Sequence, residues 1–148
     1  SRILVWQDTL RLGHDFRWSG TGLDTYIWAF PLYKQPLIGQ DVYDYAHNDY
    51  LQAFAEGGLP LIAIFALAML WGGTQLLNGW SQHEGTHTWG IGLGLLAGLV
   101  AMLVHSAYDF NLHILANAIL FVLLLALASR ILLLRRPQSG APTRVGVP

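Results

Sequence analysis

The sequence predicts an all-α, polytopic membrane protein in which three transmembrane helices follow an extracytoplasmic loop region of short helices and irregular segments. Hydrophobic residues make up 53% of the 148 residues and charged residues only 11%, whereas soluble domains have about 25% charged residues. Long runs without charge fill the second part of the chain. Most of the charged and aromatic residues lie before residue 59. Together these observations favour a membrane-embedded region joined to an amphiphilic loop region.

The transmembrane region is predicted at residues 59–134, with spans at about 59–77, 89–107 and 112–134. A helix needs about 20 apolar residues to cross the hydrocarbon core of a bilayer. A soluble core helix would show a polar face at every third or fourth residue, and these runs do not. Pro60 is expected in the first turn of the first span, where its missing N–H costs little.

Basic residues set the expected orientation of the spans. Four arginines lie near the end of the third span or beyond it, and no acidic residue accompanies them: Arg130, Arg135, Arg136 and Arg144. The positive-inside rule therefore places this end in the cytoplasm of a bacterial inner membrane. Residues 1–58 are then periplasmic, and residues 135–148 are predicted to form a disordered cytoplasmic tail.

Composition excludes several classes of function. A net charge of −1 offers no basic face for a nucleic-acid backbone, so no nucleic-acid partner is expected. The absence of cysteine excludes a disulfide framework, a thiolate nucleophile and a cysteine-ligated metal. The chain starts with neither a Met nor a signal peptide, and we therefore expect it to be part of a longer protein.

Short elements are predicted within residues 1–58. The apolar spacing of residues 2–12 suits an amphipathic helix, and Gly13 is its expected stop. Residues 19–22 should form a turn whose two glycines let the backbone bend tightly or approach a ligand. Asn48 is the expected N-cap of a short helix at 49–56, which the following glycine pair closes.

The strongest candidate for chemistry is the histidine in Ala46-His47-Asn48-Asp49-Tyr50-Leu51-Gln52, just before a predicted helix start. A neutral imidazole there could take a proton from a hydroxyl group, since its usual pKa lies near operating pH. The alternative is a histidine that caps the helix or binds water at the membrane interface.

Three arginines near the membrane surface, Arg2, Arg11 and Arg17, form a second candidate. Guanidinium groups bind phosphate oxygens through two parallel hydrogen bonds, and lipid diphosphates are anions of the membrane surface. The alternative is structural, because Arg2 lies four residues from Trp6 and could stack on its ring while the others contact lipid headgroups.

Aromatic residues and a set of histidines add weaker signals. Eleven of the eighteen aromatic residues lie before residue 59, which suits either sugar binding or a membrane-interface belt. His105, Asp109 and His113 are spaced by four and would share one face if the second span continued through them. They could support an active-site base or a proton path, or form a polar cluster between helices.

Residues His83-Glu84-Gly85-Thr86-His87 spell the H-E-x-x-H pattern of zinc metalloproteases. That chemistry needs both imidazoles on one stable helix with a third ligand nearby. The motif lies in a short connector with a glycine inside it, on the side opposite to the other polar clusters. We therefore predict no metal site.

The order of four elements is more specific than any one of them. These are Arg2-Ile3-Leu4-Val5-Trp6, Gly20-Thr21-Gly22-Leu23-Asp24-Thr25-Tyr26, Ala46-His47-Asn48-Asp49-Tyr50-Leu51 and Glu56-Gly57-Gly58-Leu59. Their order resembles the O-antigen ligase and polymerase superfamily, in which such elements line a large periplasmic loop that precedes the last membrane helices. The resemblance covers roughly residues 2–134, the C-terminal part of that family.

The resemblance implies a metal-independent, inverting glycosyltransferase that needs no cofactor. Such an enzyme takes a glycan from an undecaprenyl-diphosphate carrier to lipid A–core, to another glycan or, in some relatives, to a protein. It implies that His47 is the base and that Arg2 holds the diphosphate. Further substrate-binding and supporting positions that it implies are Arg11, Arg17, Gly20, Gly22, Asn48 and Glu56, and His105 with Asp109.

Two other classes of function stay open at this level. Some bicarbonate-transport candidates are grouped with the same superfamily, so a membrane transporter of a small solute is the main alternative. A catalytically silent membrane scaffold is the other. Uptake of solute without a lipid-linked sugar would favour the transporter. Substitutions of His47 and Arg2 without effect would favour the scaffold.

Overall fold

The computed structural model describes residues 2–36, 42–84 and 86–133, and the predicted tail at 135–148 lies outside them. No strand occurs among these residues, and the all-α prediction is confirmed. In chain order the elements are α1 (Arg2–Asp15), α2 (Tyr26–Ala29), the 3-10 helix η1 (Phe30–Leu32), α3 (Asp49–Ser81), α4 (His87–Ser106), the 3-10 helix η3 (Asn111–His113) and α5 (Leu115–Leu133).

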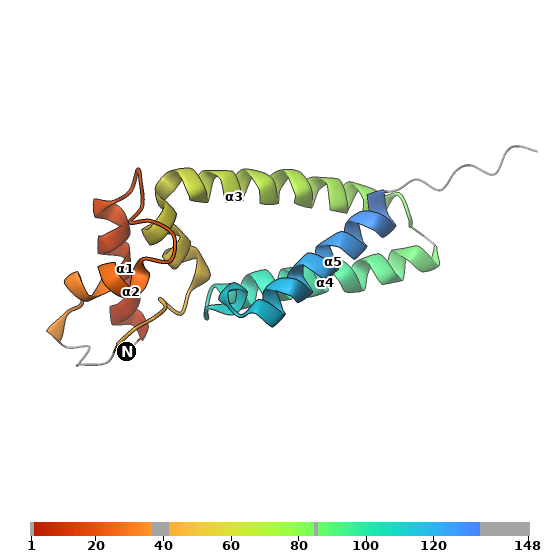
Figure 1. Ribbon diagram of the computed structural model, residues 1–148. Helices are drawn as coiled ribbons and strands as arrows, with labels where there is room; N and C mark the ends of the chain where they lie inside the picture. The colour runs from red at the N-terminus through yellow and green to blue at the C-terminus, as the bar shows by residue number, and fades with distance from the viewer. Residues whose placement is uncertain (1, 37–41, 85, 134–148) are drawn as a thin grey trace, which may run out of the picture.

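Helices α3, α4 and α5 are each long and apolar enough to span a membrane, as predicted, and the chain is a multi-pass membrane protein. Figure 1 shows α3 along one side of the molecule and the crossed α4 and α5 along the other. The loop region before α3 gathers at the end where α3 begins. That end also carries the turn between α4 and α5, so residues far apart in sequence meet there.

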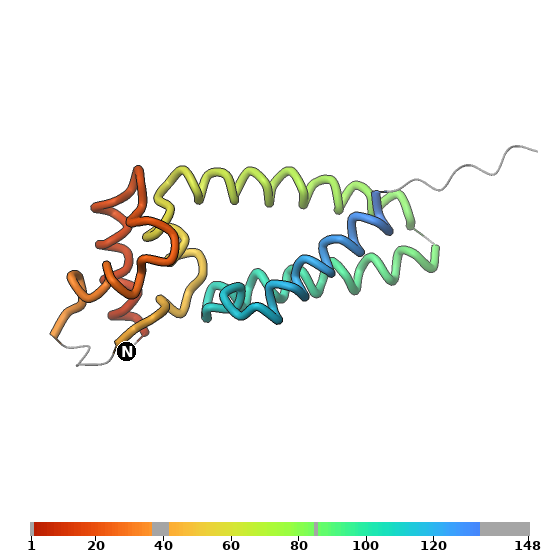
Figure 2. The backbone as a smooth tube through the Cα atoms, viewed as in Figure 1, coloured from red at the N-terminus to blue at the C-terminus, as the bar shows by residue number. Residues whose placement is uncertain are grey.

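The predicted short helix at 49–56 and the first span are one element with a kink. Gly58 has φ 66° and ψ −169°, which interrupts the helical geometry of α3, and Figure 2 shows the bend in its path. A Cβ atom at Gly58 would lie 2.7 Å from the Arg17 carbonyl oxygen, and Leu59 N–H donates to that oxygen at 2.7 Å. Glycine fits both the positive φ and the close approach.

Helix α1 does not stop at Gly13 as predicted but continues to Asp15. A Cβ atom at Gly13 would lie 2.5 Å from the ring of Phe54, so the missing side chain makes room for α3. Packing, rather than helix termination, explains this glycine. The core of the loop region consists of Val5, Leu12, Tyr26, Phe30, Ala46 and Ala55.

The far ends of the spanning helices pack through a second glycine. A Cβ atom at Gly79 in α3 would lie 2.6 Å from the Leu132 carbonyl oxygen in α5. Small residues allow such close approach of membrane helices, where van der Waals packing replaces the hydrophobic driving force. The loop end and this glycine contact together hold α3 against the other two helices.

Replacing Gly79 by Ala should push α5 away from α3 and lower the stability of the protein in detergent or nanodiscs. Overpacking of this kind costs about 1–3 kcal/mol, which a thermal unfolding curve resolves as a lower midpoint. Gly72→Ala is the matched control, because a Cβ atom there meets nothing within 4 Å. An equal midpoint shift in both variants would contradict the packing account.

Candidate functional site

The turn between α4 and α5, residues 107–114, docks onto residues 45–52, which we call the His47 segment. The Asn48 side-chain amide donates to the Ala107 carbonyl oxygen at 2.8 Å. The Tyr50 hydroxyl donates to the Leu103 carbonyl oxygen near the end of α4 at 2.7 Å. Asn48 also accepts from the backbone N–H groups of Tyr50 and Leu51, which confirms it as the N-cap of α3. The Asn48 side chain thus caps α3 and also binds the turn between α4 and α5.

His47 pairs with Asp109 across this junction. Its Nδ1 atom lies 3.0 Å from Asp109 Oδ1, and both side chains are about one-third exposed. The hydrogen bond from His47, together with that from the Phe110 backbone N–H, lowers the pKa of the Asp109 carboxyl. In the neutral form of His47, a carboxylate at Nδ1 places the proton on that nitrogen, so Nε2 then presents a lone pair. This arrangement is suited to a general base.

The backbone at His47 is strained. Its φ is 51°, a left-handed conformation that costs a non-glycine residue about 1–3 kcal/mol. The anchored Asn48 on one side and buried Ala46 on the other hold it. The conformation directs the ring against Phe110, with 5.0 Å between ring centroids. Strain of this kind, kept by its surroundings, is typical of functional positions.

A second imidazole–carboxylate pair lies beside the first, with the roles of the two segments exchanged. His113 Nδ1 lies 2.7 Å from Asp49 Oδ1, and the Leu112 N–H donates to the other Asp49 oxygen at 2.9 Å. Asp49 is almost fully buried. The Asp49 hydrogen bond is the largest cause that raises the pKa of His113, while partial burial opposes it. The Asp49 carboxylate therefore favours the charged imidazolium form of His113, and we call this pair the charged clamp.

Arg2 reaches this site from the start of α1. Its Nη1 donates to the Tyr108 carbonyl oxygen at 3.2 Å, and its charge contributes to the lowered pKa of Asp109. Arg11 lies about 13 Å farther along α1 and pairs with buried Asp8 at 3.2 Å. Arg17 contributes its carbonyl oxygen to the α3 kink. The resemblance implies that Arg2 holds the diphosphate, and the structure brings Arg2 to the pair of His47 and Asp109. A helping role for Arg11 or Arg17 stays a prediction.

The two glycines of the G-x-G element contact the protein itself. A Cβ atom at Gly20, where φ is 64°, would lie 2.0 Å from the Glu56 carbonyl oxygen. The Gly22 N–H donates to that oxygen at 3.0 Å. The Glu56 side chain accepts from the backbone N–H groups of Asp24 and Tyr26 and from the Gln52 amide. These contacts make the G-x-G element and Glu56 a rigid support for the site. Direct substrate contact by Gly20, Gly22, Asn48 and Glu56 stays a prediction.

The expected His105, Asp109 and His113 face does not form. Helix α4 ends at Ser106, so the three residues do not follow one another on a helix. Asp109 and His113 turn to different partners on the His47 segment, while His105 is exposed. In the H-E-x-x-H motif, His83 lies in the turn after α3 and His87 begins α4. Its imidazoles therefore lack the common helix that the zinc pattern needs.

Sequence reasoning missed two residues: Asp49, which is the partner of His113, and Gln52. Gln52 is buried, accepts from the Ala46 N–H and donates to Glu56, so it links the start of the His47 segment to Glu56 in α3. A signal was present: Asp49 and Gln52 are polar residues three apart on a short helix whose neighbours are mostly apolar. Nothing in the spacing indicated which residues beyond 100 they would meet.

An apolar cavity of about 170 Å³ lies beside the second pair. Ala53, Ile62, Phe65 and Leu112 supply most of its wall, and Asp49, Tyr50 and His113 close its polar end. The cavity therefore joins the membrane-facing start of α3 to the charged clamp.

Comparison with known proteins agrees with the resemblance drawn from the motifs. Residues 1–66 match the family described as O-antigen ligase, which confirms that resemblance over these residues. No curated protein and no solved structure matches the chain. The matched part contains Arg2, the G-x-G element and His47, and it ends inside α3. It indicates an enzyme of glycan transfer in a membrane.

The charged clamp predicts a titration. His113 should titrate above its ordinary value of 6.5, and Asp49→Asn should lower its pKa because the carboxylate partner is lost. Histidine NMR of the protein in nanodiscs measures both. A histidine whose pKa is higher in the folded state stabilises the fold at pH values below its unfolded-state pKa. This stabilisation disappears as pH rises through the folded-state pKa. The stability gap between the wild type and Asp49→Asn should therefore narrow as pH rises from below 6.5 through the folded-state pKa of His113.

Asp15→Asn serves as the control, because Asp15 is exposed and its ion-pair contact is with His14 rather than His113. It should leave the His113 titration unchanged. Identical His113 curves in the wild type and Asp49→Asn would contradict the clamp.

Proposed function

We propose, on the premise that residues 1–66 carry the sequence pattern of the O-antigen ligase family, that the protein transfers a glycan from an undecaprenyl-diphosphate carrier to a sugar hydroxyl. The acceptor is lipid A–core or another glycan. The observation that carries the proposal is the pairing of His47 Nδ1 with Asp109 Oδ1 at 3.0 Å. It leaves Nε2 of the neutral imidazole as a proton acceptor and has Arg2 on the Asp109 side of the pair, where the spanning helices meet the loop region.

The proposed reaction is a single displacement. His47 Nε2 accepts the proton of the acceptor hydroxyl, and the oxygen attacks the anomeric carbon of the donor. The bond from that carbon to the diphosphate oxygen breaks, and its electron pair leaves with undecaprenyl diphosphate. Attack opposite the leaving group inverts the anomeric centre. The ionised Asp109 stabilises the imidazolium that forms, as a carboxylate does behind a catalytic histidine.

Arg2 supplies positive charge toward the leaving diphosphate. Its exposed guanidinium group uses one N–H on the Tyr108 carbonyl oxygen, and a guanidinium group has five N–H donors in all. Remaining donors can bind phosphate oxygens as negative charge develops there, which is a large term in such transfers. The apolar cavity at Phe65 and Leu112 suits part of the isoprenoid chain. The carrier would thus lie along α3 with its head group at the site.

The proposed location is the periplasmic face of the inner membrane. Support comes from the arginines near the end of the third span and beyond it, of which the structure describes Arg130 in the last turn of α5. The His47 segment and the α4–α5 turn lie at the other end of the spanning helices. With the arginine-rich end in the cytoplasm, both catalytic segments face the periplasm, where a flipped lipid-linked glycan is available.

Changing His47 to Ala in the full-length protein should abolish glycan transfer, because the proton acceptor is lost. Gels of surface glycan ladders and transfer in vesicles to acceptor glycan from the same cells both measure it. Membrane insertion should be normal, and Glu84→Gln, a change at an exposed residue in the turn after α3, should keep full activity. Ladders of normal length in the His47→Ala strain would defeat the proposal.

Asp109→Asn should lower kcat by about 10²–10⁴-fold with little change in the KM for the donor. The amide cannot stabilise the imidazolium, although it keeps the shape of the carboxylate. Asp109→Glu should restore part of the rate, because it returns the charge. Steady-state kinetics in vesicles separate the two constants. A kcat for Asp109→Asn within threefold of the wild type would remove Asp109 from the mechanism.

A further inference from the structure

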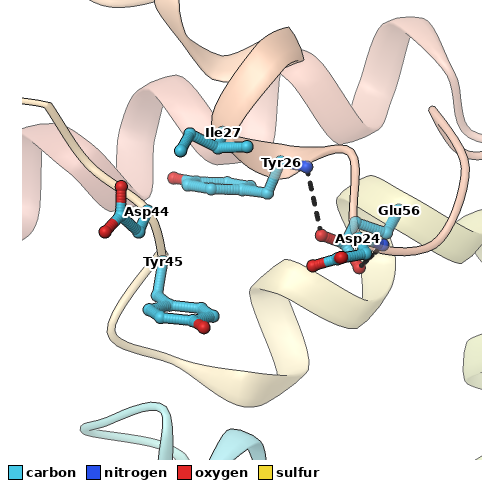
Figure 3. Close-up of a pocket in the computed structure, with 6 residues that line it drawn as sticks. All are labelled: Asp24, Tyr26, Ile27, Asp44, Tyr45 and Glu56. Carbon is cyan, nitrogen blue, oxygen red and sulfur yellow. Dashed lines mark hydrogen bonds between the residues drawn. The ribbon is translucent and has the colours of Figure 1, made fainter.

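A cavity of about 210 Å³ opens next to the His47 segment. Figure 3 shows Asp44 and Tyr45 on one side of it and Asp24 and Glu56 on the other, with Tyr26 and Ile27 between them. Pockets for drug-sized ligands measure about 300–1,000 Å³. This cavity is therefore of a size for one ring rather than a chain of several.

The lining combines an aromatic ring with carboxylates. Asp24 and Asp44 are exposed at the rim, and carboxylates accept short, strong hydrogen bonds from hydroxyl groups. The half-buried ring of Tyr45 offers a flat surface for the C–H face of a sugar. Several hydroxyl donors around one apolar face are what a sugar ring presents. The lining thus matches a polyhydroxylated ring better than a purely apolar ligand.

The wall of the cavity is held in place before any ligand arrives. Asp24 has φ 60°, and its N–H donates to Glu56 Oε2 at 3.1 Å. The Tyr26 N–H donates to the other Glu56 oxygen at 3.2 Å. Glu56 is itself buried and held by Gln52. A fixed wall lowers the ordering cost of binding.

The cavity is one aromatic ring away from the proposed base. The Tyr45 ring stacks on Phe110 with 4.8 Å between centroids, and Phe110 contacts the His47 ring at 5.0 Å. Tyr45 also lies two residues before His47 in sequence. A sugar resting at Tyr45 could therefore extend a hydroxyl, or a neighbouring sugar, to His47.

Charge separates the two sides of the site. Arg2 lies on the Asp109 side of His47, where it lowers the pKa of that carboxyl. The cavity side carries the carboxyl groups of Asp24, Asp44 and Glu56. Anionic groups repel a diphosphate, and such repulsion sets orientation and specificity. The donor head group is thus directed to Arg2, and the cavity is left for an uncharged partner.

We propose that this cavity, lined by Asp24, Asp44 and Tyr45, is a subsite for an uncharged sugar ring of the acceptor glycan. The subsite orients the acceptor so that its reacting hydroxyl meets His47 Nε2. The assignment rests on the proposed glycan transfer, because the subsite is assigned to the acceptor by its position relative to His47, the proposed base. It goes further in placing acceptor and donor on opposite sides of the imidazole.

The test uses the full-length protein in vesicles with lipid-linked donor and acceptor glycan from the same cells. The double variant Asp24→Asn, Asp44→Asn keeps the shape of both side chains, and asparagine tolerates positive φ. It should raise the KM for the acceptor by about tenfold or more, since charge-assisted hydrogen bonds are lost. The KM for the donor and kcat at saturating acceptor should stay unchanged, and Glu84→Gln should match the wild type.

A binding measurement makes failure of the subsite distinguishable from failure of the proposed function. Saturation-transfer NMR with the acceptor oligosaccharide, freed of lipid, should show binding to the wild type and to His47→Ala but not to the double variant. An unchanged acceptor KM with retained binding in the double variant would overturn the subsite. A rise in the donor KM alone would assign the cavity to the donor instead and would equally overturn it. Binding without transfer by the wild type would leave the subsite standing and remove the proposed function.

Discussion

The site depends on the crossed pairing between two short segments. The His47 segment contributes an imidazole to Asp109 and a carboxylate to His113, so each segment supplies one member of each pair. Pairing at 3.0 Å and 2.7 Å leaves little freedom for one segment to slide past the other. Because the partners are more than 60 residues apart, this contact closes the loop end of the molecule. Hydrogen bonds from Asn48 and Tyr50 reinforce it.

Two elements whose residue types suggest ligand binding instead form a rigid support for the site. The G-x-G element and the Glu56 stretch of α3 bind each other through close backbone contacts, and Glu56 fixes the wall of the acidic cavity. The kink at Gly58 then turns α3 from this wall into its membrane-spanning course. In the proposed reaction, substrate binding falls to groups at the edges: Arg2 on one side of His47, and Asp24 with Asp44 on the other. The result is a site with a cationic and an anionic side.

Local features of this fold could be predicted from the sequence, and contacts between distant segments could not. Three apolar runs of bilayer length indicated the spanning helices, and an asparagine before a polar helix start indicated the N-cap at 48. Gly13 was misjudged because a glycine inside a helix and one at its end look alike until the packing partner, Phe54, is known. The helical spacing of 105, 109 and 113 suggested a shared face. The early end of α4 instead sends Asp109 and His113 to partners that no periodicity reveals.

The convergence of His47 and Asp109 on one side of the membrane is the claim most open to a direct measurement. Cysteines placed at both positions, in a full-length protein otherwise free of cysteine, can be joined by a short thiol-specific cross-linker in intact membranes. The account predicts an intramolecular cross-link and labelling of both positions by a membrane-impermeant reagent from the periplasm, whereas a cysteine at position 84 should be labelled only from the cytoplasm. Failure to cross-link, with position 109 labelled from the same side as position 84, would contradict it.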